Sequence, residues 1–273
     1  MEQHINNLTP PERLDLIRHK NRPTVKDYFP LIFDEFIEMH GDRYFGDDRA
    51  IIGGIASISG IPVTAIAEVK GRNINENKES NFAMPHPEGY RKALRLAKQA
   101  EKFHRPVICF IDTPGAFCGV DAEKRGQGEA IARNLMEFMT LRTPVISVVL
   151  GEGGSGGALA LGVCDELAIL ENAIYSVISP RGFASILWKD DTREREACSI
   201  MKITAEDMIN LGIAEKIIEE PLGGAQNDVS QTAENIAEFL YKSLCKKMKI
   251  DIDVLLNERY TKFRKIGEFE ESV

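Results

Sequence analysis

The chain has 273 residues, and 43% of them are hydrophobic, which is enough for one large folded domain and too much for a disordered protein. Its 34 Lys and Arg residues stand against 42 Asp and Glu residues, so the formal charge is −8, which disfavours nucleic acid and anionic membranes as partners. The five Cys are odd in number and include no C-x-x-C pair. This argues against a disulfide framework and a zinc ribbon, and favours a reducing, cytoplasmic compartment.

The N-terminal part of the chain is polar at first and then has a helical pattern. Residues 1–23 contain three prolines and no apolar core of the kind that a signal peptide needs, so we expect an arm outside the core. From Thr24 to Ile37 the apolar residues recur at helical spacing. Pro30 interrupts this pattern, which predicts a helix that starts late or kinks there.

The middle of the chain alternates strands with helices. We expect strands at 51–58 and 61–69 joined as a hairpin, a loop at 71–81, a helix at 87–104, a strand at 106–111, a loop at 112–119, a helix at 121–141, a strand at 144–150, a glycine-rich turn at 151–157, a helix over 158–163, and short strands at 166–170 and 174–178. This alternation is typical of an α/β fold with right-handed crossovers. None of the apolar runs approaches the roughly 20 residues that span a bilayer, so no membrane segment is expected.

The C-terminal part is mostly helical in pattern beyond Thr204, apart from a short apolar segment at 213–218. No internal repeat or low-complexity linker divides the chain. The sequence therefore predicts an N-terminal arm at 1–23, a single domain at 24–245 and a charged helical tail at 246–273.

The most informative segment is the glycine-rich turn at 151–157, which reads Gly-Glu-Gly-Gly-Ser-Gly-Gly between a buried strand and a helix. Glycine lets backbone N–H groups approach a ligand because no Cβ stands in the way. The start of the helix adds unpaired N–H groups and the positive end of the helix dipole. The segment therefore predicts a site for an oxyanion, a phosphate or a carboxylate.

Four other interpretations of these glycines are weaker. A tight turn with close packing needs fewer glycines, because each costs about 0.5–1 kcal/mol in an ordered element. A dinucleotide site matches G-x-G-x-x-G, but too few strands follow to complete that fold. A serine hydrolase would use Ser155, yet the last histidine of the chain is His104, so no triad histidine follows. A P-loop needs a Gly-Lys-Ser or Gly-Lys-Thr sequence that is absent here.

A backbone oxyanion hole that stabilises an enolate needs no histidine and no metal. It takes two N–H donors, one from each of two neighbouring strand-to-helix loops. A second such loop is present at 112–119, where Gly115 and Gly119 flank Ala116 and Phe117. The two loops together therefore fit this interpretation.

The ordered set of motifs resembles the alpha-subunit family of bacterial acetyl-coenzyme A carboxylase carboxyltransferases. The motifs are Gly41-Asp-Arg-Tyr-Phe-Gly-Asp-Asp, Ile52-Gly-Gly-Ile, Met84-Pro-His-Pro-Glu-Gly-Tyr-Arg-Lys-Ala-Leu-Arg, Phe110-Ile-Asp-Thr-Pro-Gly-Ala, Arg125-Gly-Gln-Gly-Glu-Ala-Ile-Ala-Arg-Asn, Gly151-Glu-Gly-Gly-Ser-Gly-Gly-Ala-Leu-Ala, Tyr175-Ser-Val-Ile-Ser-Pro, Ala184-Ser-Ile-Leu-Trp-Lys and Pro221-Leu-Gly-Gly-Ala. They extend over most of residues 24–225.

The resemblance implies a crotonase-like (ClpP/crotonase) α/β fold, a spiral of ββα units with helical terminal additions. It also implies an enzyme subunit that transfers a carboxyl group from carboxybiotin on a carrier protein to acetyl-CoA, which gives malonyl-CoA in the first committed step of fatty acid biosynthesis. The partners implied are a beta subunit in an α2β2 heterotetramer, a biotin carboxyl carrier protein and biotin carboxylase. No cofactor is implied to stay bound to this chain, and zinc is expected only in the beta subunit.

The same resemblance implies roles for the glycine loops. Gly156 and Gly157 would hold the ureido oxygen of the biotin enolate, and Ala116 and Phe117 would be the second pair of backbone donors. The substrate-binding residues implied are Gly115, Gly153, Gly154 and Ser155, and no metal ligand is implied.

Two departures from the family pattern stand out, and two alternatives stay open. Arg181 lies where family members usually have Glu, which leaves the role of that position in doubt, and the N-terminal arm is shorter than in longer relatives. The first alternative is a stand-alone acyl-CoA hydratase or isomerase of crotonase type that uses Glu152. The second is a non-catalytic scaffold subunit of the same complex.

Overall fold

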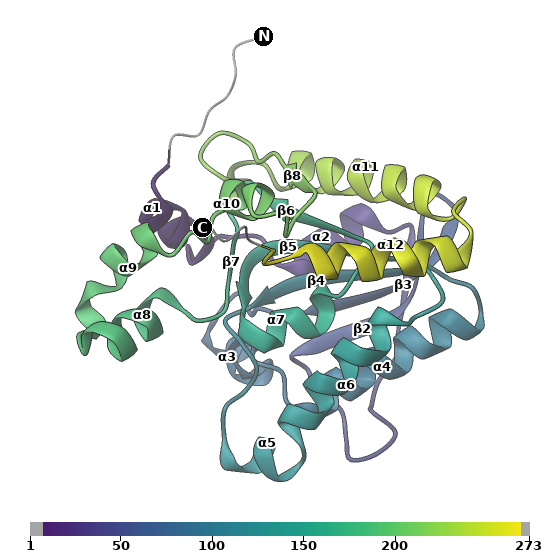
Figure 1. Cartoon of the computed structure of the whole chain (residues 1–273), viewed down its shortest axis with the longest axis horizontal. Helices are drawn as coiled ribbons and strands as arrows, with labels where there is room; N and C mark the ends of the chain where they lie inside the picture. The colour runs from purple at the N-terminus through teal and green to yellow at the C-terminus, as the bar shows by residue number, and fades with distance from the viewer. Residues whose placement is uncertain (1–7, 269–273) are drawn as a thin grey trace, which may run out of the picture.

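The computed structural model describes residues 8–268, which form a mixed sheet with helices on both sides (Figure 1). Eight strands form the sheet: β1 (Glu35–Glu38), β2 (Ile51–Ile58), β3 (Ile61–Glu68), β4 (Val107–Thr113), β5 (Val145–Gly154), β6 (Glu166–Leu170), β7 (Ile174–Ser176) and β8 (Lys216–Ile218). Their order is β1-β2-β3-β4-β5-β6-β8, and β7 pairs with the end of β5. Strand β2 pairs antiparallel with both β1 and β3, and the pairs from β3 onward are parallel.

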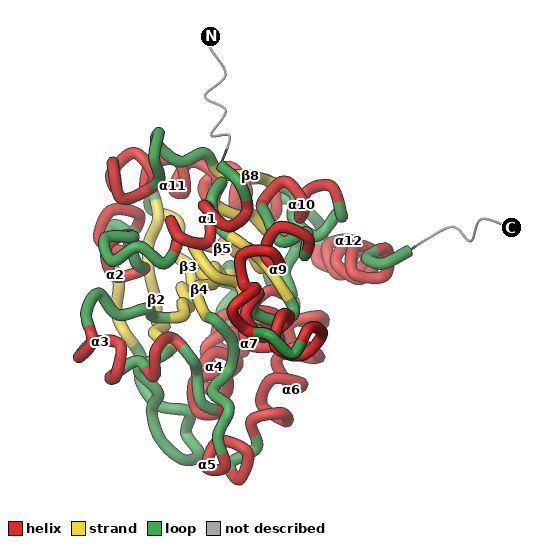
Figure 2. Tube along the Cα trace, turned by 90° about the vertical axis from the view of Figure 1, so that its left-hand side faces the viewer, coloured by secondary structure: helices red, strands yellow, loops and turns green. Residues whose placement is uncertain are grey.

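Helices cover both faces of the sheet. The helices are α1 (Pro10–Ile17), α2 (Val25–Ile32), α3 (Ile74–Glu79), α4 (Pro87–Lys102), α5 (Val120–Lys124), α6 (Gln127–Met139), α7 (Ser155–Gly162), α8 (Pro180–Phe183), α9 (Glu194–Ile200), α10 (Ala205–Asn210), α11 (Val229–Lys247) and α12 (Ile252–Lys265). Helices α2 and α11 lie on one side of the sheet, and α4, α6 and α7 on the other (Figures 1 and 2). Within residues 8–268, no helix is both long and apolar enough to cross a membrane.

Strand β4 shows why both faces need cover. All seven of its residues are buried, as expected for a parallel strand between two helical layers. The ring of Phe110 packs 5.4 Å from that of Phe29 on α2. The next side chain, Ile111, points to the opposite face, where it lies close to Gly162 on α7. The predicted hairpin, the helix beginning at Pro87 and the alternation of strands and helices are all confirmed.

Three element predictions were wrong. The helical pattern to Ile37 ends at α2, which runs through Pro30, and Ile37 belongs to strand β1. The predicted loop at 71–81 contains α3, because the Asn73 side chain accepts the Asn75 and Glu76 N–H groups and caps the helix. The predicted helix at 121–141 is two helices.

The break between α5 and α6 lies at Gly126, whose left-handed backbone (φ 84°) interrupts the α-helical course. The short apolar segment predicted at 213–218 forms strand β8 over its second half, at the far edge of the sheet from β1. Helix α12 makes up half of the predicted helical tail, and the last five residues of the tail lie outside the described part of the chain.

Both ends of the described chain are fastened to the domain by buried ion pairs. The Arg22 guanidinium pairs with Glu220, and both side chains are at most 3% exposed. Arg259 on α12 makes two 2.8 Å contacts with Asp165 and donates to the carbonyls of Phe138, Leu141 and Thr143.

The segment predicted as an arm packs on the domain through α1, and its first seven residues lie outside the described part of the chain. Leu14 and Ile17 of α1 join Ile174, Cys198 and Ile203 in a small second core. The three prolines therefore did not indicate a segment free of the core: two of them, Pro10 and Pro11, begin a helix, a position that proline tolerates.

Candidate functional site

The glycine-rich segment is mostly strand, and its turn is short. Strand β5 continues to Gly154, with Gly153 paired to Thr113 on one side and to Tyr175 on the other. The chain turns at Ser155, whose left-handed backbone (φ 53°) starts helix α7. The predicted turn at 151–157 is therefore corrected to 155–157, because the first four residues complete the ladder between β4 and β7.

Close packing explains most of the glycines. A Cβ built on Gly154 would lie 2.2 Å from the Pro114 carbonyl oxygen, and one on Gly157 would lie 2.5 Å from the Ala116 nitrogen. Such distances force backbone atoms apart, so neither position accepts a side chain. Gly156 differs, because its Cβ would meet only a methyl group of Ile131, at 3.6 Å. The packing interpretation thus accounts for Gly154 and Gly157, but not for Gly156.

The two predicted loops meet, and their amides differ in availability. Gly156 and Gly157 lie in the first turn of α7, where N–H groups have no partner within the helix. The Ala116 N–H has no hydrogen-bond partner among the described residues. The prediction of Phe117 as a second donor is corrected, because its N–H donates to the Pro85 carbonyl at 3.0 Å and is not free for a ligand.

A cavity of about 320 Å³ opens where the loops meet. Its lining comes from both loops, from α6 and from the segment after β7, and comprises Pro114, Gly115, Ala116, Ile131, Ser155, Gly156, Gly157, Val177, Ile178 and Ser179. Gly153 and Gly154, predicted to bind substrate, are not among these residues because they are buried within β5. An adjoining apolar cavity of about 540 Å³ shares Ser155, Gly156, Val177 and Ile178 and extends toward Phe183 and Met208.

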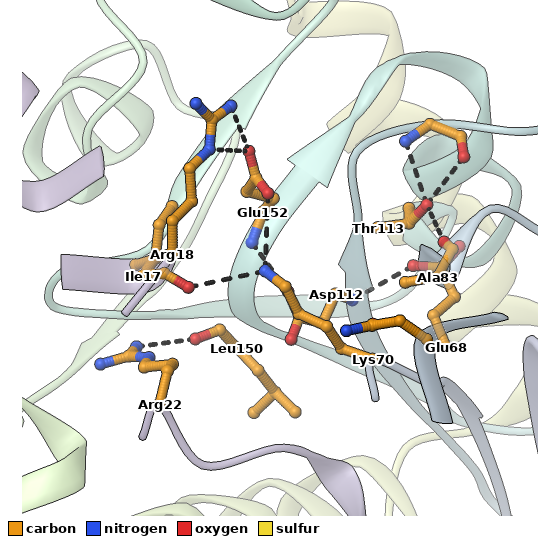
Figure 3. A network of polar contacts seen from close by, with 12 residues as sticks. Ile17, Arg18, Arg22, Glu68, Lys70, Ala83, Asp112, Thr113, Leu150 and Glu152 are labelled. Atoms are coloured by element: carbon orange, nitrogen blue, oxygen red, sulfur yellow. Dashed lines mark hydrogen bonds and ion pairs between the residues drawn. The ribbon is translucent and has the colours of Figure 1, made fainter. Parts of the chain in front are cut away.

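A carboxylate ladder supports the ends of the strands beneath these loops (Figure 3). The β4–β5 pairing shifts register between Ile111 and Thr113. Asp112 fills the gap by accepting the Glu152 N–H at 3.0 Å, and its own N–H donates to Glu68 at 3.2 Å. Burial raises the pKa of the Glu68 carboxyl well above its usual range; the Asp112 N–H opposes this and the Asp112 charge adds to it.

Glu152 is committed to ion pairs rather than to the cavity. Its carboxylate lies 2.8 Å from Arg18 and 3.5 Å from Lys70 (Figure 3). Burial favours its neutral form, but Lys70 and Arg18 outweigh burial and hold the pKa of Glu152 below its usual value. An acyl-CoA hydratase or isomerase would need this carboxylate in the cavity, whose lining does not include it.

The chemistry of other candidate groups is also constrained. Ser155 makes no hydrogen bond to a histidine within residues 8–268, so the geometry of a hydrolase triad is missing there. The described part of the chain contains no cluster of three or more His, Cys, Asp or Glu residues placed to hold a metal ion. What the geometry offers is a neutral backbone site for a small negative charge.

Two residues that hold the 112–119 loop were missed by the sequence analysis. The Thr113 hydroxyl accepts the Gly115 N–H at 3.0 Å, and the buried Gln127 amide donates to the Phe117 carbonyl at 2.9 Å. Both residues occur in motifs quoted above. The Thr113 contact is a Ser/Thr turn to the N–H two residues on, a local pattern that could have suggested it. Gln127 bonds a carbonyl ten residues earlier, and no spacing rule indicates that contact.

Comparison with known proteins identifies the family. A family model described as "Acetyl co-enzyme A carboxylase carboxyltransferase-like" matches residues 1–267. The chain is 60% identical over 265 residues to the acetyl-coenzyme A carboxylase carboxyl transferase subunit alpha of Clostridium acetobutylicum, and the match covers 97% of each chain. A Clostridium tetani relative described as subunits beta/alpha is 57% identical over 94% of this chain and 45% of its own length.

Solved structures of more distant proteins share the fold. Transcarboxylase 12S aligns with a TM-score of 0.70 and 18% identity over 89% of this chain and 45% of its own. A Pseudomonas malonate decarboxylase hetero-tetramer aligns with a TM-score of 0.67 and 18% identity over 85% of this chain and 90% of its own. The predicted crotonase-like α/β fold is confirmed. With a match over nearly its whole length, this chain belongs to the acetyl-coenzyme A carboxylase carboxyltransferase family, within its alpha-subunit branch.

Proposed function

We propose that this chain is the alpha half of a carboxyltransferase that moves a carboxyl group from carboxybiotin to acetyl-CoA and so forms malonyl-CoA for fatty acid synthesis. Membership of the alpha-subunit branch supports the reaction class. The observation that carries the mechanism is the meeting of two strand-to-helix loops around one cavity, with backbone N–H groups from both.

Negative charge develops on the ureido oxygen of biotin when its carboxyl group leaves, and this chain's backbone stabilises that charge. Gly156 and Gly157 present first-turn amides at the positive end of α7. Ala116 presents the amide of the opposite loop. Removing one such donor commonly costs about 10²–10³-fold in rate. The biotin nitrogen takes the proton from the acetyl methyl group, so this step needs no protein base.

Gly115 and Ser155 line the same cavity and complete the binding surface for the ureido ring. The open space at Gly156 has a purpose in this proposal, because a side chain there would occupy the position of the ligand.

The proposal includes partners and a location. The fused beta/alpha relative of Clostridium tetani supports a beta subunit as the obligate partner. An α2β2 heterotetramer, a biotin carboxyl carrier protein and biotin carboxylase complete the proposed assembly, with acetyl-CoA as acceptor and zinc in the beta subunit alone. No cofactor is proposed to remain on this chain, and the proposed location is the cytoplasm.

The test is the reverse reaction, malonyl-CoA decarboxylation with free biocytin as acceptor. We expect activity when this chain and its beta partner are combined, and none from either alone. Activity of this chain alone would contradict the divided site and favour a stand-alone crotonase-type enzyme. A scaffold role predicts that variants of the glycine loops leave the activity of the complex unchanged.

Gly156→Phe sharpens the test, with Gly46→Phe as the matched control. A Cβ at either glycine meets nothing closer than 3.6 Å, so both variants can fold. We expect Gly156→Phe to assemble with the beta subunit but to lose carboxyl transfer, and Gly46→Phe to retain it. Full activity of Gly156→Phe would overturn the proposed site.

A further inference from the structure

We propose that Gln127 and Thr113 are positioning residues that hold the loop so that the amides on both sides of Ala116 are satisfied and the Ala116 N–H is left as the free donor among residues 115–117. This inference rests on the proposed oxyanion role of that amide. It concerns two side chains that touch no substrate and act on the backbone of residues 113–117.

Gln127 holds the loop from the helix that follows it. It is the first residue of α6 and only 4% exposed. Its Nε2 donates to the Phe117 carbonyl at 2.9 Å and to the Pro85 carbonyl at 2.8 Å. The Pro85 carbonyl also accepts the Phe117 N–H at 3.0 Å. The Gln127 amide therefore ties the Phe117 carbonyl to the same Pro85 oxygen that accepts the Phe117 N–H.

Thr113 holds the other end of the loop. Its side chain is fully buried, its hydroxyl donates to the Ala83 carbonyl, and its oxygen accepts the Gly115 N–H at 3.0 Å. The amides on both sides of Ala116 are thus satisfied within the protein. Among residues 115–117 only the Ala116 N–H is left, and its nitrogen lies beside Gly157, 2.5 Å from where a Cβ on Gly157 would stand.

Thr113 and Gln127 both donate hydrogen bonds to the same segment, the turn at 81–85. Asn81, Phe82 and Ala83 are consecutive non-glycine residues with φ between 50° and 60°, a conformation that L-residues rarely adopt. Asp48 anchors this turn from both ends: it accepts the Asn81 side-chain amide at 3.4 Å and the His86 N–H at 2.7 Å. Strain of this kind persists where surrounding contacts determine the backbone. The turn therefore acts as a fixed support for the loop.

The consequence for catalysis is geometric. A donor misplaced by about 1 Å can cost about 10²-fold in rate. Releasing Phe117 allows its peptide to rotate, and the Ala116 amide rotates with it because the two residues share a short loop. Loss of the Gln127 or Thr113 hydrogen bonds should lower kcat without changing the KM for malonyl-CoA, since neither side chain lines the cavity.

The experiment uses the complex with the beta subunit and three variants at position 127. Gln127→Ala removes both donors, and Gln127→Glu keeps the shape but presents a carboxylate to two carbonyls at neutral pH. We expect kcat for malonyl-CoA decarboxylation with biocytin to fall 10- to 100-fold in both. A protonated Glu can donate one hydrogen bond, so Gln127→Glu should regain part of its kcat below neutral pH, while Gln127→Ala should not. Gln127→Met, which fills the space without a donor, should behave as Gln127→Ala.

Two controls separate positioning from stability. Asn134, on the same helix α6, is also buried, and its side-chain amide donates to the Ala160 carbonyl at 3.4 Å. Asn134→Ala removes this donor without adding a charge and should keep kcat within about twofold when corrected for assembled complex. Thr113→Val should lower kcat as Gln127→Ala does, and Thr113→Ser should keep it close to wild type because the hydroxyl is retained. Equal losses in Asn134→Ala and Gln127→Ala, or a Gln127→Ala kcat within twofold of wild type, would overturn the inference.

A second measurement does not depend on activity. Amide hydrogen exchange of Phe117 should accelerate at least tenfold in Gln127→Ala, with exchange at Gly156 and Gly157 unchanged. If the wild-type complex transfers no carboxyl group, the proposed function fails. The exchange result still shows in that case whether Gln127 holds the backbone at Phe117. Unchanged exchange at Phe117 would contradict the positioning role of Gln127, whatever reaction the complex catalyses.

Discussion

The loop after β5 and the loop after β4 supply amides to the same cavity, yet they are held in different ways. Residues 155–157 take their geometry from the first turn of a helix. Residues 113–117 have no helix start of their own near Ala116, and two side chains, Thr113 and Gln127, hold them in place. The first loop thus depends on the absence of side chains, and the second depends on their presence.

This difference teaches where each loop is vulnerable. Added atoms damage the 155–157 loop at Gly157, because this glycine touches the backbone of the partner loop. Removed atoms damage the 113–117 loop, because its support comes from hydrogen bonds. The comparison can therefore be tested in two ways: by adding atoms to the 155–157 loop, and by removing the side-chain hydrogen bonds that support the 113–117 loop.

The largest effect is expected for Gly157→Val. The new Cβ would lie 2.5 Å from the Ala116 nitrogen and 2.8 Å from the Gly115 carbonyl carbon, so the loops must separate. We expect carboxyl transfer to fall by at least about 10²–10³-fold, the cost of one lost oxyanion donor. Steady-state kinetics of the assembled complex measures it. Transfer within tenfold of wild type would show that the two loops need not touch.

A smaller effect is expected from pH. Burial opposes the charged Glu152, yet Lys70 and Arg18 lower its pKa in the folded chain below the ordinary 4.5. The stabilisation from these ion pairs is therefore complete above pH 4.5 and is lost as the pH falls through the lower, folded-state pKa. Urea unfolding at several pH values should show this loss below pH 4.5 in wild type. The loss should be shallower in Glu152→Gln; an equal slope in both proteins would contradict the role of these pairs beneath β5.

Gly156→Ala sharpens the contrast within one loop. Its methyl group would meet only Ile131, at 3.6 Å, so the backbone is free to stay in place. We expect the free energy of unfolding to change by less than about 1 kcal/mol, since alanine also favours the helix. Thermal unfolding beside Gly157→Val makes the comparison. Equal destabilisation of the two variants would mean that contact between the loops is not what distinguishes them.

The smallest effect is expected away from both loops, at Arg181. Its guanidinium pairs with Asp191 at 2.5 Å, but both side chains are exposed, at 67% and 45%. Exposed pairs contribute about 0–1 kcal/mol. Arg181→Glu, which introduces the residue that the family resemblance led us to expect here, should therefore leave stability and transfer almost unchanged in the complex. A tenfold change in transfer would assign a function to this position.

Elements whose conformation is determined by the residues within them were predicted correctly from the sequence. The hairpin at Ile51–Glu68 and the helix beginning at Pro87 follow from residue types that prefer those conformations. The glycines of the 155–157 loop were identified from the sequence because glycine marks positions where the backbone has no room for a Cβ or must be open to a ligand. The same glycines led to an overlong turn, since Gly151 and Gly153 in a strand look no different from glycines in a loop.

The rest depended on contacts between distant residues. Phe117 was predicted as a donor, but Pro85, 32 residues earlier in the numbering, takes its N–H. Nothing near Asn81 in the sequence predicts three left-handed residues in a row, because that turn is imposed by Asp48 and by the loop it supports. Side chains that bond remote backbone are invisible to any local rule.

The buried guanidinium of Arg259 bears on the order in which this chain can fold. It neutralises Asp165 at the start of β6 and satisfies carbonyls at 138, 141 and 143, which precede β5. Until that arginine is in place, the Asp165 carboxylate keeps the Val145 N–H as a hydrogen-bond donor but lacks its guanidinium partner, and the three carbonyls lack the donors that Arg259 supplies. We therefore expect the sheet between β5 and β6 to reach its final packing only after α12 has been synthesised and has docked.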